Sequence, residues 1–315
     1  MVDFSVIILV HNERQTIAQI IERLICYSSH FSLEILILDS ESTDNTPHII
    51  KQLQKKHRLI KYLRIKRRDF HYADTRNKAV LLAKGKYVLF ISGDAIPMSK
   101  NLFHLFFEDL NRSNETVAVF GKHIPNSVAG IQDIETICKF EQLDSFTGPT
   151  GIFIQNRTSM SSSLKRNDTL FYFLSNVFSC YKRSFLLQHP FSRVVVKDKE
   201  LKGKEDISLG KKIIEMGLTK IYDKRCEVKH SNNLDILQYY NRQKEEFGLM
   251  VTAFNVSPTH NILCKIKKIS SIDIQFVKKI SFFLSLFLYY VIKIVIVLEY
   301  FLNNKKIMIP DSNPK

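Results

Sequence analysis

Short apolar runs alternate with segments of helical spacing through residues 1–97, and this alternation limits the chain to one class of fold. Four runs are predicted to be buried strands: Phe4–Val10, Glu34–Leu38, Ile60–Ile65 and Tyr87–Ile91. Apolar residues three and four positions apart predict helices between them: Glu13–Cys26, Thr46–Leu53 and Ala73–Ala83. Strands that alternate with helices predict an α/β fold with a mostly parallel sheet and right-handed crossovers.

The pattern is less regular after residue 100. Helical spacing predicts three more helices: Asn101–Leu110, Gln132–Leu143 and Ile207–Met216. A further strand is predicted at Val117–Phe120, and the apolar segment Phe171–Tyr181 is predicted to return to the sheet. The polar segment Thr147–Asn167, which contains glycine and several serines, is predicted to be a mobile loop over a site.

The C-terminal region differs in composition from the rest. The apolar run Ile280–Leu302 is long enough to span a bilayer, but a charge such as Lys293 is costly inside one. Lysines precede the run at positions 265, 267, 268, 278 and 279. We therefore predict helices lying on an anionic membrane surface, with a single spanning helix and a soluble core helix as alternatives. The predicted division is a nucleotide-binding half at 1–97 and an acceptor half at 98–250, which together form one domain at 1–250, and a membrane-associating region at 251–315.

The net charge of +15 predicts an anionic partner such as a nucleic acid, a membrane surface or a phosphorylated ligand. Nucleic acid is disfavoured because the sequence has neither zinc-finger spacing nor an RNP-like motif. The five cysteines are scattered without a CxxC pair, which indicates free thiols in a reducing compartment. Since Val6–Val10 is too short for a secretory signal, we expect the chain to start in the cytoplasm.

Polar residues follow three of the predicted strands directly, at Val10–Glu13, Asp39–Thr46 and Ser92–Asp94. The carboxyl ends of parallel strands share one edge of a sheet, and open α/β sheets bind their ligands there. The sequence therefore predicts a nucleotide site at this edge. Further polar groups that can complete it occur later in the chain: Asp74–Ala79, Lys204–Asp206 and Val228–His230.

These motifs together resemble those of the family 2 inverting glycosyltransferases, which have the GT-A fold. Ser5–Glu13 (SVIILVHNE) is similar to the family's S-V-I-I-x-x-x-N-E start, and Ile37–Thr46 (ILDSESTDNT) is similar to its V-D-x-x-S-x-D-x-T segment. Three further motifs resemble the bacterial rhamnosyltransferase-like members, whose patterns are T-R-N, Q-D-A-I-P and S-N-x-x-S-x-Y-R-R: Thr75–Asn77, Gly93–Pro97 and Ser175–Arg183. The resemblance extends from about Ser5 to about Gly248.

The resemblance implies where a nucleoside-diphosphate-sugar donor binds. It assigns the donor site to seven residues: Val10, Asn12, Glu13, Asp39, Ser40, Arg76 and Gly93. Within this set, Asp39 is expected to contact the nucleotide base and Arg76 to lie against the base or the diphosphate.

The resemblance also implies the catalytic and metal residues. Asp206, with Glu205 beside it, matches the acidic pair that supplies the general base. Asp94 matches a metal ligand, and His230 matches a position that can supply a further metal ligand or a diphosphate contact. An inverting transfer needs a base for the acceptor hydroxyl and a cation for the leaving diphosphate. We expect Mg²⁺ or Mn²⁺, although the family's DxD motif is reduced to Ser92-Gly93-Asp94.

Each candidate residue also has an ordinary structural explanation. Asp39 can cap the following helix, and the acids Glu205 and Asp206 can form a solvated first helical turn. Arg76 can be a solvated surface residue, and His230 can be an ordinary half-buried histidine. The convergence of these residues on one edge favours the functional interpretation.

We therefore predict an inverting glycosyltransferase that acts in bacterial cell-surface polysaccharide synthesis, such as O-antigen or capsule. It would move a sugar, with rhamnose as the first candidate, from a nucleoside-diphosphate donor to a lipid-linked or saccharide acceptor. We expect it at the cytoplasmic face of the cell membrane, attached peripherally or by one C-terminal helix. Two alternatives are an inactive nucleotide-sugar-binding protein of the same fold and a basic nucleic-acid-binding module.

Overall fold

The computed structural model describes residues 2–28, 30–125, 131–159, 168–196, 199–201, 203–231, 237–244 and 287–299. The chain forms two compact units. Met1–Asn126 with Lys139–Ser231 make up the first, and Ser127–Cys138 with Asn232–Lys315 make up the second. The first unit contains the main sheet and all the candidate site residues.

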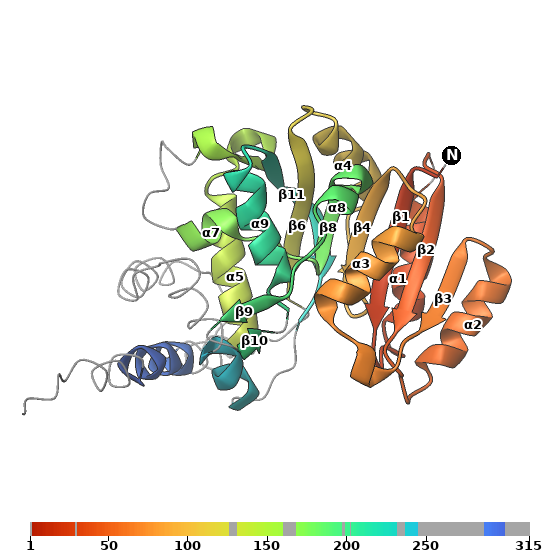
Figure 1. Cartoon of the computed structure of the whole chain (residues 1–315), viewed down its shortest axis with the longest axis horizontal. Coiled ribbons are helices and arrows are strands. Elements are labelled where there is room, and N and C mark those ends of the chain that lie inside the picture. Colours follow the sequence, from red (N-terminus) through yellow and green to blue (C-terminus); the bar gives the residue numbers. More distant parts are fainter. Residues whose placement is uncertain are drawn as a thin grey trace, which may run out of the picture. The chain divides into compact units, whose positions relative to one another are not determined.

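The main sheet of the first unit has nine strands (Figure 1). Their bounds are β1 Phe4–Val10, β2 Leu33–Asp39, β3 Ile60–Arg64, β4 Tyr87–Ser92, β5 Ile96–Pro97, β6 Thr116–Ile124, β7 Ile152–Gln155, β8 Phe178–Lys182 and β11 Thr219–Lys229. They lie in the order β3-β2-β1-β4-β8-β6-β11-β5, and β7 also pairs with β11. A separate two-stranded hairpin consists of β9 Val194–Val196 and β10 Lys199–Leu201.

Strands β1 to β4 form a parallel half-sheet, as the sequence predicts. Its register places Val10 beside Asp39, and Leu9 beside Ser92, so the polar ends of three strands meet at one edge. Strand β8 runs antiparallel between β4 and β6 and joins this half to the parallel pair β6 and β11. The start of β8 therefore lies at the same edge as the end of β4.

Helices and short 3₁₀ turns connect these strands. Their bounds are α1 Ile17–Tyr27, α2 Thr46–Lys56, η1 Arg67–Asp69, α3 Tyr72–Leu82, α4 Leu102–Leu110, α5 Ile131–Asp144, η2 Gly148–Thr150, α7 Asp168–Tyr172, α8 Arg183–Gln188 and α9 Glu205–Glu215. The predicted helices thus form within a few residues of their expected bounds. The apolar residues of α1 that are three and four positions apart are fully buried: Ile17, Ile20, Ile21 and Leu24.

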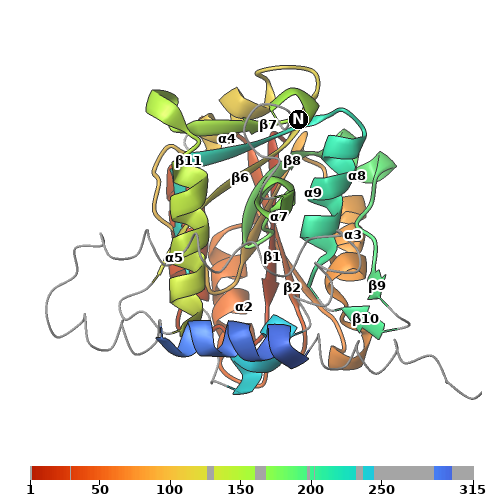
Figure 2. The ribbon, with the colours of Figure 1, turned by 90° about the vertical axis from the view of Figure 1, so that its left-hand side faces the viewer.

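Alternate residues of each strand enter two cores on opposite faces of the sheet. Val6 and Ile8 pack in the core with α1, α2 and α4, whereas Ile7 packs in the core with α3, α8 and α9. Figure 2 shows α3, α8 and α9 together on one side of the sheet. Because both faces are covered, these strands read as continuous apolar runs in the sequence.

The structure corrects two predictions in the middle of the chain. The predicted loop Thr147–Asn167 contains β7, which pairs antiparallel with β11 at Ile152–Gln155. This strand is so short that the polar residues around it hide its apolar pattern; residues 160–167 of the predicted loop lie outside the described part. The predicted return segment Phe171–Tyr181 is divided, since Phe171 belongs to α7 and only Phe178 onward belongs to the sheet.

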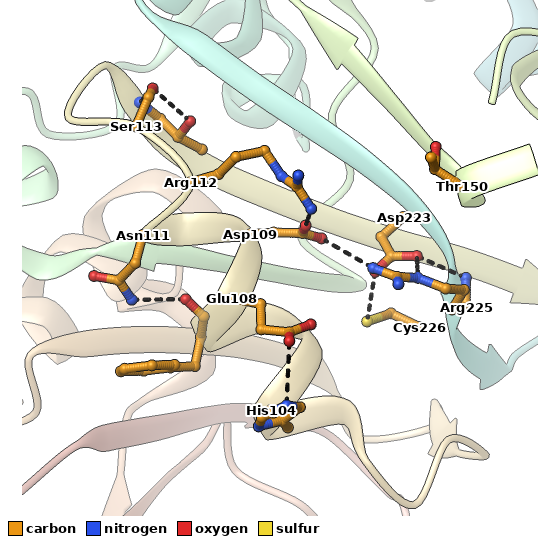
Figure 3. A network of polar contacts seen from close by, with 12 residues as sticks. His104, Glu108, Asp109, Asn111, Arg112, Ser113, Thr150, Asp223, Arg225 and Cys226 are labelled. Atoms are coloured by element: carbon orange, nitrogen blue, oxygen red, sulfur yellow. Dashed lines mark hydrogen bonds and ion pairs between the residues drawn. The ribbon is translucent and has the colours of Figure 1, made fainter. Parts of the chain in front are cut away.

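A buried polar network fixes an irregularity in β11 (Figure 3). The register of β11 against β6 shifts between Asp223 and Glu227. The Asp223 carboxylate, which is fully buried, accepts hydrogen bonds at 2.8 and 2.9 Å from the Arg225 guanidinium. Asp109 of α4 is also fully buried and lies 3.9 Å from the same guanidinium. This network sets the register of the last residues of β11, which lead to His230.

The second unit contains the first part of α5, at 131–138, and two further described helices, at 237–244 and 287–299. Tyr239 packs against the second helix, where Tyr289, Ile292 and Ile296 are buried. The Glu299 carboxylate accepts hydrogen bonds from Tyr240 and Lys244, each at 2.5 Å.

The predicted membrane region falls mostly outside the described residues. Of the apolar run Ile280–Leu302, the structure describes residues 287–299, and the preceding lysines at 265–279 are not described. Within the described ranges, no helix combines the length and apolarity needed to cross a membrane. The boundary expected at residue 250 likewise stays a prediction.

Candidate active site

The loop after β1 is joined to the loop after β2 by Asn12. This residue has a φ of 62°, a conformation that Asn tolerates better than most residues. Its backbone N–H donates to Ser42 Oγ at 2.9 Å, and its side-chain Oδ1 accepts from the Thr43 N–H at 2.8 Å. Asn12 therefore shapes the edge of the sheet next to Val10, where the sequence places the donor.

Asp39 at the end of β2 is fully buried, and its carboxylate binds neighbouring protein groups. Oδ1 accepts hydrogen bonds from the Ser42 N–H at 2.8 Å and the Ser42 hydroxyl at 2.6 Å, and Oδ2 accepts from the Tyr62 hydroxyl at 2.5 Å. Burial and the Asp39 carboxylate raise the pKa of Tyr62. In this structure Asp39 organises its loop, and its contact with a nucleotide base stays a prediction.

Ser40 is buried beside Asp39 and binds two neighbouring segments. Its hydroxyl is 3.0 Å from Arg67 Nη1, and its carbonyl is 2.8 Å from His11 Nδ1. These contacts place a guanidinium next to the predicted donor site, a feature that sequence reasoning did not single out.

Gly93 allows the ends of β1 and β4 to approach closely. A Cβ at this position would lie 2.9 Å from both Val10 Cγ1 and Glu13 Cγ, closer than real Cβ contacts. The Thr16 hydroxyl donates to the Gly93 carbonyl at 2.7 Å and fixes the turn to the start of α1. A side chain in place of Gly93, such as the family's Gln, would therefore require Val10 and Glu13 to shift.

Three of the predicted residues, Glu13, Asp94 and His230, form a cluster at the sheet edge, which we call the rim cluster. His230 Nε2 lies 3.3 Å from Asp94 Oδ2, and the Asp94 side chain is 34% exposed. The pKa of Glu13 is raised to about 7 by burial and by the charges of Asp94 and Asp44, while His230 lowers it. The rim cluster thus has an excess of negative charge.

The rim cluster suits a divalent cation in part. A carboxylate and an imidazole side by side are a donor set that Mn²⁺ or Mg²⁺ accepts, with phosphate and water oxygens as further ligands. In the described residues, no group of three or more His, Cys, Asp or Glu is arranged to hold a metal. Asp94 and His230 would therefore hold a cation together with the donor's phosphates.

His123 is a neighbour of the rim cluster that sequence reasoning missed. It lies at the end of β6, is buried, and its ring centroid is 5.7 Å from that of His230. Burial, with the charges of His230 and Lys139, holds the pKa of His123 well below its usual range. Its position after the predicted strand Val117–Phe120 was the signal that could have indicated it.

Asp206 lies in the first turn of α9, where two backbone groups hold its carboxylate. Oδ2 accepts from the Asn176 N–H at 3.1 Å, and Oδ1 accepts from the Ile207 N–H at 2.8 Å. The pKa of Asp206 is raised to about 6 by burial and by the charge of Glu205, while Arg76 opposes the rise. A carboxylate with this pKa is ionised at neutral pH and still basic enough to accept a proton.

The S-N-x-x-S-x-Y motif supports this loop. Asn176 Oδ1 accepts hydrogen bonds from the Ser179 hydroxyl at 2.9 Å and the Tyr181 hydroxyl at 2.7 Å. Both donors are on β8, so the motif fixes the Asn176 backbone that faces Asp206. The motif therefore positions the predicted base.

Arg76 and Glu205 are paired with each other. Arg76 Nη1 forms a hydrogen bond with Glu205 Oε1, and the two residues are 7% and 3% exposed. The structure thus gives Arg76 a protein partner, and its contact with the donor stays a prediction. The next residue, Asn77, binds both the N–H and the carbonyl of Phe191, which ties α3 to the segment before α9.

Comparison with known proteins shows the family. The model of glycosyl transferase family 2 matches residues 5–164, half of the chain. This chain belongs to glycosyl transferase family 2. The family predicted from the motifs is therefore confirmed.

Two curated relatives are similar over part of their length. The chain is 26% identical over 213 residues to the O-antigen chain rhamnosyltransferase WbaN of Salmonella anatum, which covers 66% of this chain and 60% of WbaN. It is 27% identical over 130 residues to a poly(ribitol-phosphate) beta-glucosyltransferase of Bacillus spizizenii, covering 39% of this chain and 20% of that protein. The chain thus spans 60% and 20% of the length of these relatives.

Solved structures confirm the predicted GT-A-like α/β fold. A mannosyltransferase from Pyrobaculum calidifontis, solved with GDP-Man and Mn²⁺, has a TM-score of 0.58 at 15% identity and covers 94% of this chain and 86% of its own. TarS of S. aureus, solved with UDP, has a TM-score of 0.53 at 17% identity and covers 79% and 66%. At these identities the likeness concerns the fold alone.

Proposed function

We propose that this protein is an inverting glycosyltransferase of cell-surface polysaccharide synthesis, with Asp206 as its general base. One observation carries the proposal. The Ser92 N–H donates to the Val177 carbonyl at 3.0 Å, and the next N–H back along the chain, that of Asn176, binds Asp206. The strand end that leads to Asp94 and the loop that holds Asp206 are thereby joined by backbone hydrogen bonds.

The geometry supports different roles for Asp206 and for the pair Asp94 and His230. Asp206 would take the proton from the acceptor hydroxyl as that oxygen attacks the sugar. A divalent cation at Asp94 and His230 would neutralise charge on the leaving nucleoside diphosphate. The Arg67 guanidinium beside Ser40 adds positive charge on the donor side.

The names of the relatives suggest which donors to test. WbaN is a rhamnosyltransferase, so rhamnose is the first candidate sugar, and fold neighbours were solved with UDP, UDP-GlcNAc and GDP-Man. Ligand binding raises the melting temperature by mass action. A panel of nucleotide-sugars should therefore contain one donor that raises Tm, and more strongly with Mn²⁺ than with EDTA.

The control is Asp94→Asn, in which the effect of Mn²⁺ on donor binding should disappear. A panel in which no donor changes Tm under any condition would contradict the proposed function. Donor binding without donor hydrolysis or transfer would support the inactive nucleotide-sugar-binding alternative, which the replacement of the first DxD acid by Ser92 favours.

We also propose that the protein works on the cytoplasmic face of the cell membrane, where a lipid-linked acceptor is available. The helix at 287–299 has an exposed apolar stripe, formed by Phe287, Val291, Ile294, Val295 and Leu298. In the sequence, Lys278 and Lys279 precede this helix. An apolar stripe that basic residues precede in the sequence suits a helix lying in the plane of an anionic membrane.

Vesicle sedimentation tests this location. The protein should bind phosphatidylglycerol-containing vesicles, and Leu298→Glu should weaken binding about tenfold because it places a charge in the stripe. The matched control is Leu81→Glu, an exposed leucine of α3 in the first unit, which should bind like the unchanged protein. The proposal would be contradicted if Leu298→Glu bound vesicles as well as the unchanged protein. It would also be contradicted if light scattering showed that the protein forms dimers through this stripe.

A further inference from the structure

We propose that Arg76 and Glu205 form a positioning pair that holds the Asp206 carboxylate in place and balances two opposite charges beside it. The proposal rests on the proposed function where it concerns catalysis. The location of the pair and its effect on Asp206 are independent of that function.

The pair is enclosed by the protein. The Arg76 guanidinium lies 5.3 Å from the Tyr72 ring centroid and 5.7 Å from that of Phe90, and so occupies an aromatic site between α3 and β4. Glu205 approaches it from the first turn of α9. A diphosphate that used Arg76 would have to displace this carboxylate from a nearly inaccessible site.

The pair is incompletely hydrogen bonded. Arg76 Nε and Glu205 Oε2 are buried and have no hydrogen-bond partner within the described ranges. Burying charged groups with unpaired atoms is costly, and replacing such pairs with apolar residues is often neutral or stabilising. Stability alone therefore does not account for this pair, which indicates a role in the site.

The two charges act on Asp206 in opposite directions. The groups that face Asp206 are Glu205 on its own helix, Arg76 on α3 and the Tyr181 phenol on β8. Glu205 raises the pKa of Asp206, and Arg76 lowers it. In the intact pair the two effects oppose each other, so removing one leaves the other uncompensated.

Arg76 affects the position of Asp206 through the backbone of α9. Glu205 precedes Asp206 in the first turn of α9, so anchoring Glu205 to Arg76 fixes that turn against α3. The Asn176 N–H then meets Asp206 Oδ2 at 3.1 Å. Arg76 is therefore a positioning residue that acts through Glu205.

The test is a ¹³C-carboxyl NMR titration of aspartate-labelled protein, with the Asp206 signal assigned by its loss in Asp206→Asn. Arg76→Gln should raise the Asp206 pKa by about one unit, and Glu205→Gln should lower it by a similar amount. The double variant Arg76→Gln/Glu205→Gln should return it close to the starting value. The double variant leaves no unpaired charge, so it should fold even if a single variant does not. Such a rescue of folding would show that the two charges act as a pair, and a double variant that also fails to fold would contradict it.

Two controls separate this effect from a general loss of charge. Arg193→Gln removes the exposed guanidinium that pairs with Asp74 on the same helix α3, and it should leave Asp206 unchanged. Arg76→Lys retains the positive charge, so the Asp206 pKa in this variant should be close to that of the unchanged protein and not shifted as in Arg76→Gln.

Activity gives a second measurement. With an active donor, the acidic limb of the kcat/KM pH profile should move in the same direction as the NMR titration in each variant. An Asp206 signal that titrates identically in all variants would overturn the proposal. So would a tenfold loss of donor affinity in Arg76→Gln with Asp206 unmoved, which would make Arg76 a donor ligand. If no donor is turned over, the proposed function fails, while the NMR result still decides this inference.

Discussion

Two acidic clusters lie at the same edge of the sheet and differ in how their charge is balanced. The rim cluster of Glu13, Asp94 and His230 is partly exposed, and burial together with the charge of Asp94 raises the pKa of Glu13 to about 7. The second cluster, which we call the inner cluster, consists of Arg76, Glu205 and Asp206. It contains its own cation, since Arg76 pairs with Glu205. The charge of the inner cluster is balanced within the protein. The rim cluster has no such cation of its own, so binding a cation from solution would lower its free energy.

The largest expected effect concerns the inner cluster. Asp206→Asn removes the proposed base but leaves the rim cluster intact, so transfer should fall by about 10²–10⁴-fold. Donor affinity should stay near that of the unchanged protein. Single-turnover transfer and equilibrium donor binding measure the two quantities, and retained turnover would remove Asp206 from the mechanism.

The next prediction concerns stability. Glu205→Gln leaves the Arg76 charge buried without its partner, and breaking such a pair costs about 3 kcal/mol. The free energy of unfolding in urea should fall by that amount. The double variant Arg76→Gln/Glu205→Gln should recover much of the loss; if it is no more stable than Glu205→Gln alone, the pair is not coupled.

Gly93→Ala tests the packing beneath the rim cluster. The added Cβ would lie 2.9 Å from Val10 Cγ1 and Glu13 Cγ, so overpacking should cost about 1–2 kcal/mol. The melting temperature should fall accordingly. Gly148→Ala is the comparison variant. Its Cβ would have open space, but its φ of +57° strains the backbone of an alanine, so it tests strain without a steric clash. A Gly93→Ala protein as stable as the unchanged one would show that the strand ends can separate.

The smallest effect has the opposite sign to that of Glu205→Gln. Glu13→Gln removes one of the mutually repelling charges of the rim cluster, so it should stabilise the cation-free protein, by no more than about 1 kcal/mol after solvent screening. The folded-state pKa of Glu13 lies above its ordinary value of 4.5, so its carboxylate destabilises the fold increasingly as the pH rises from 4.5 to about 7, and by a constant amount above that. The gain should therefore be full at pH 8 and absent at pH 4. If Glu13→Gln were less stable than the unchanged protein at pH 8, the negative charge of the rim cluster would not be unbalanced as described.

The sequence predicted the parts of this molecule that depend on local patterns. Strands β1 to β4 are apolar runs that end in turn residues, and their common edge follows from parallel pairing. The pairing of Arg76 with Glu205 joins residues 129 positions apart, so it depends on how α3 and α9 pack. Asp39 shows the same limit, because its contact with Tyr62 is set by the register of β2 against β3.

The position of β8 has a consequence for how the chain folds during synthesis. Residues 178–182 fill the gap between β4 and β6, although both of these strands are made earlier. Until those residues leave the ribosome, the nascent half-sheet has an unpaired apolar edge at β4, the kind of edge that invites wrong partners. This short strand thus closes the β4 edge, and the other edge of β6 is closed only after β11 has been made.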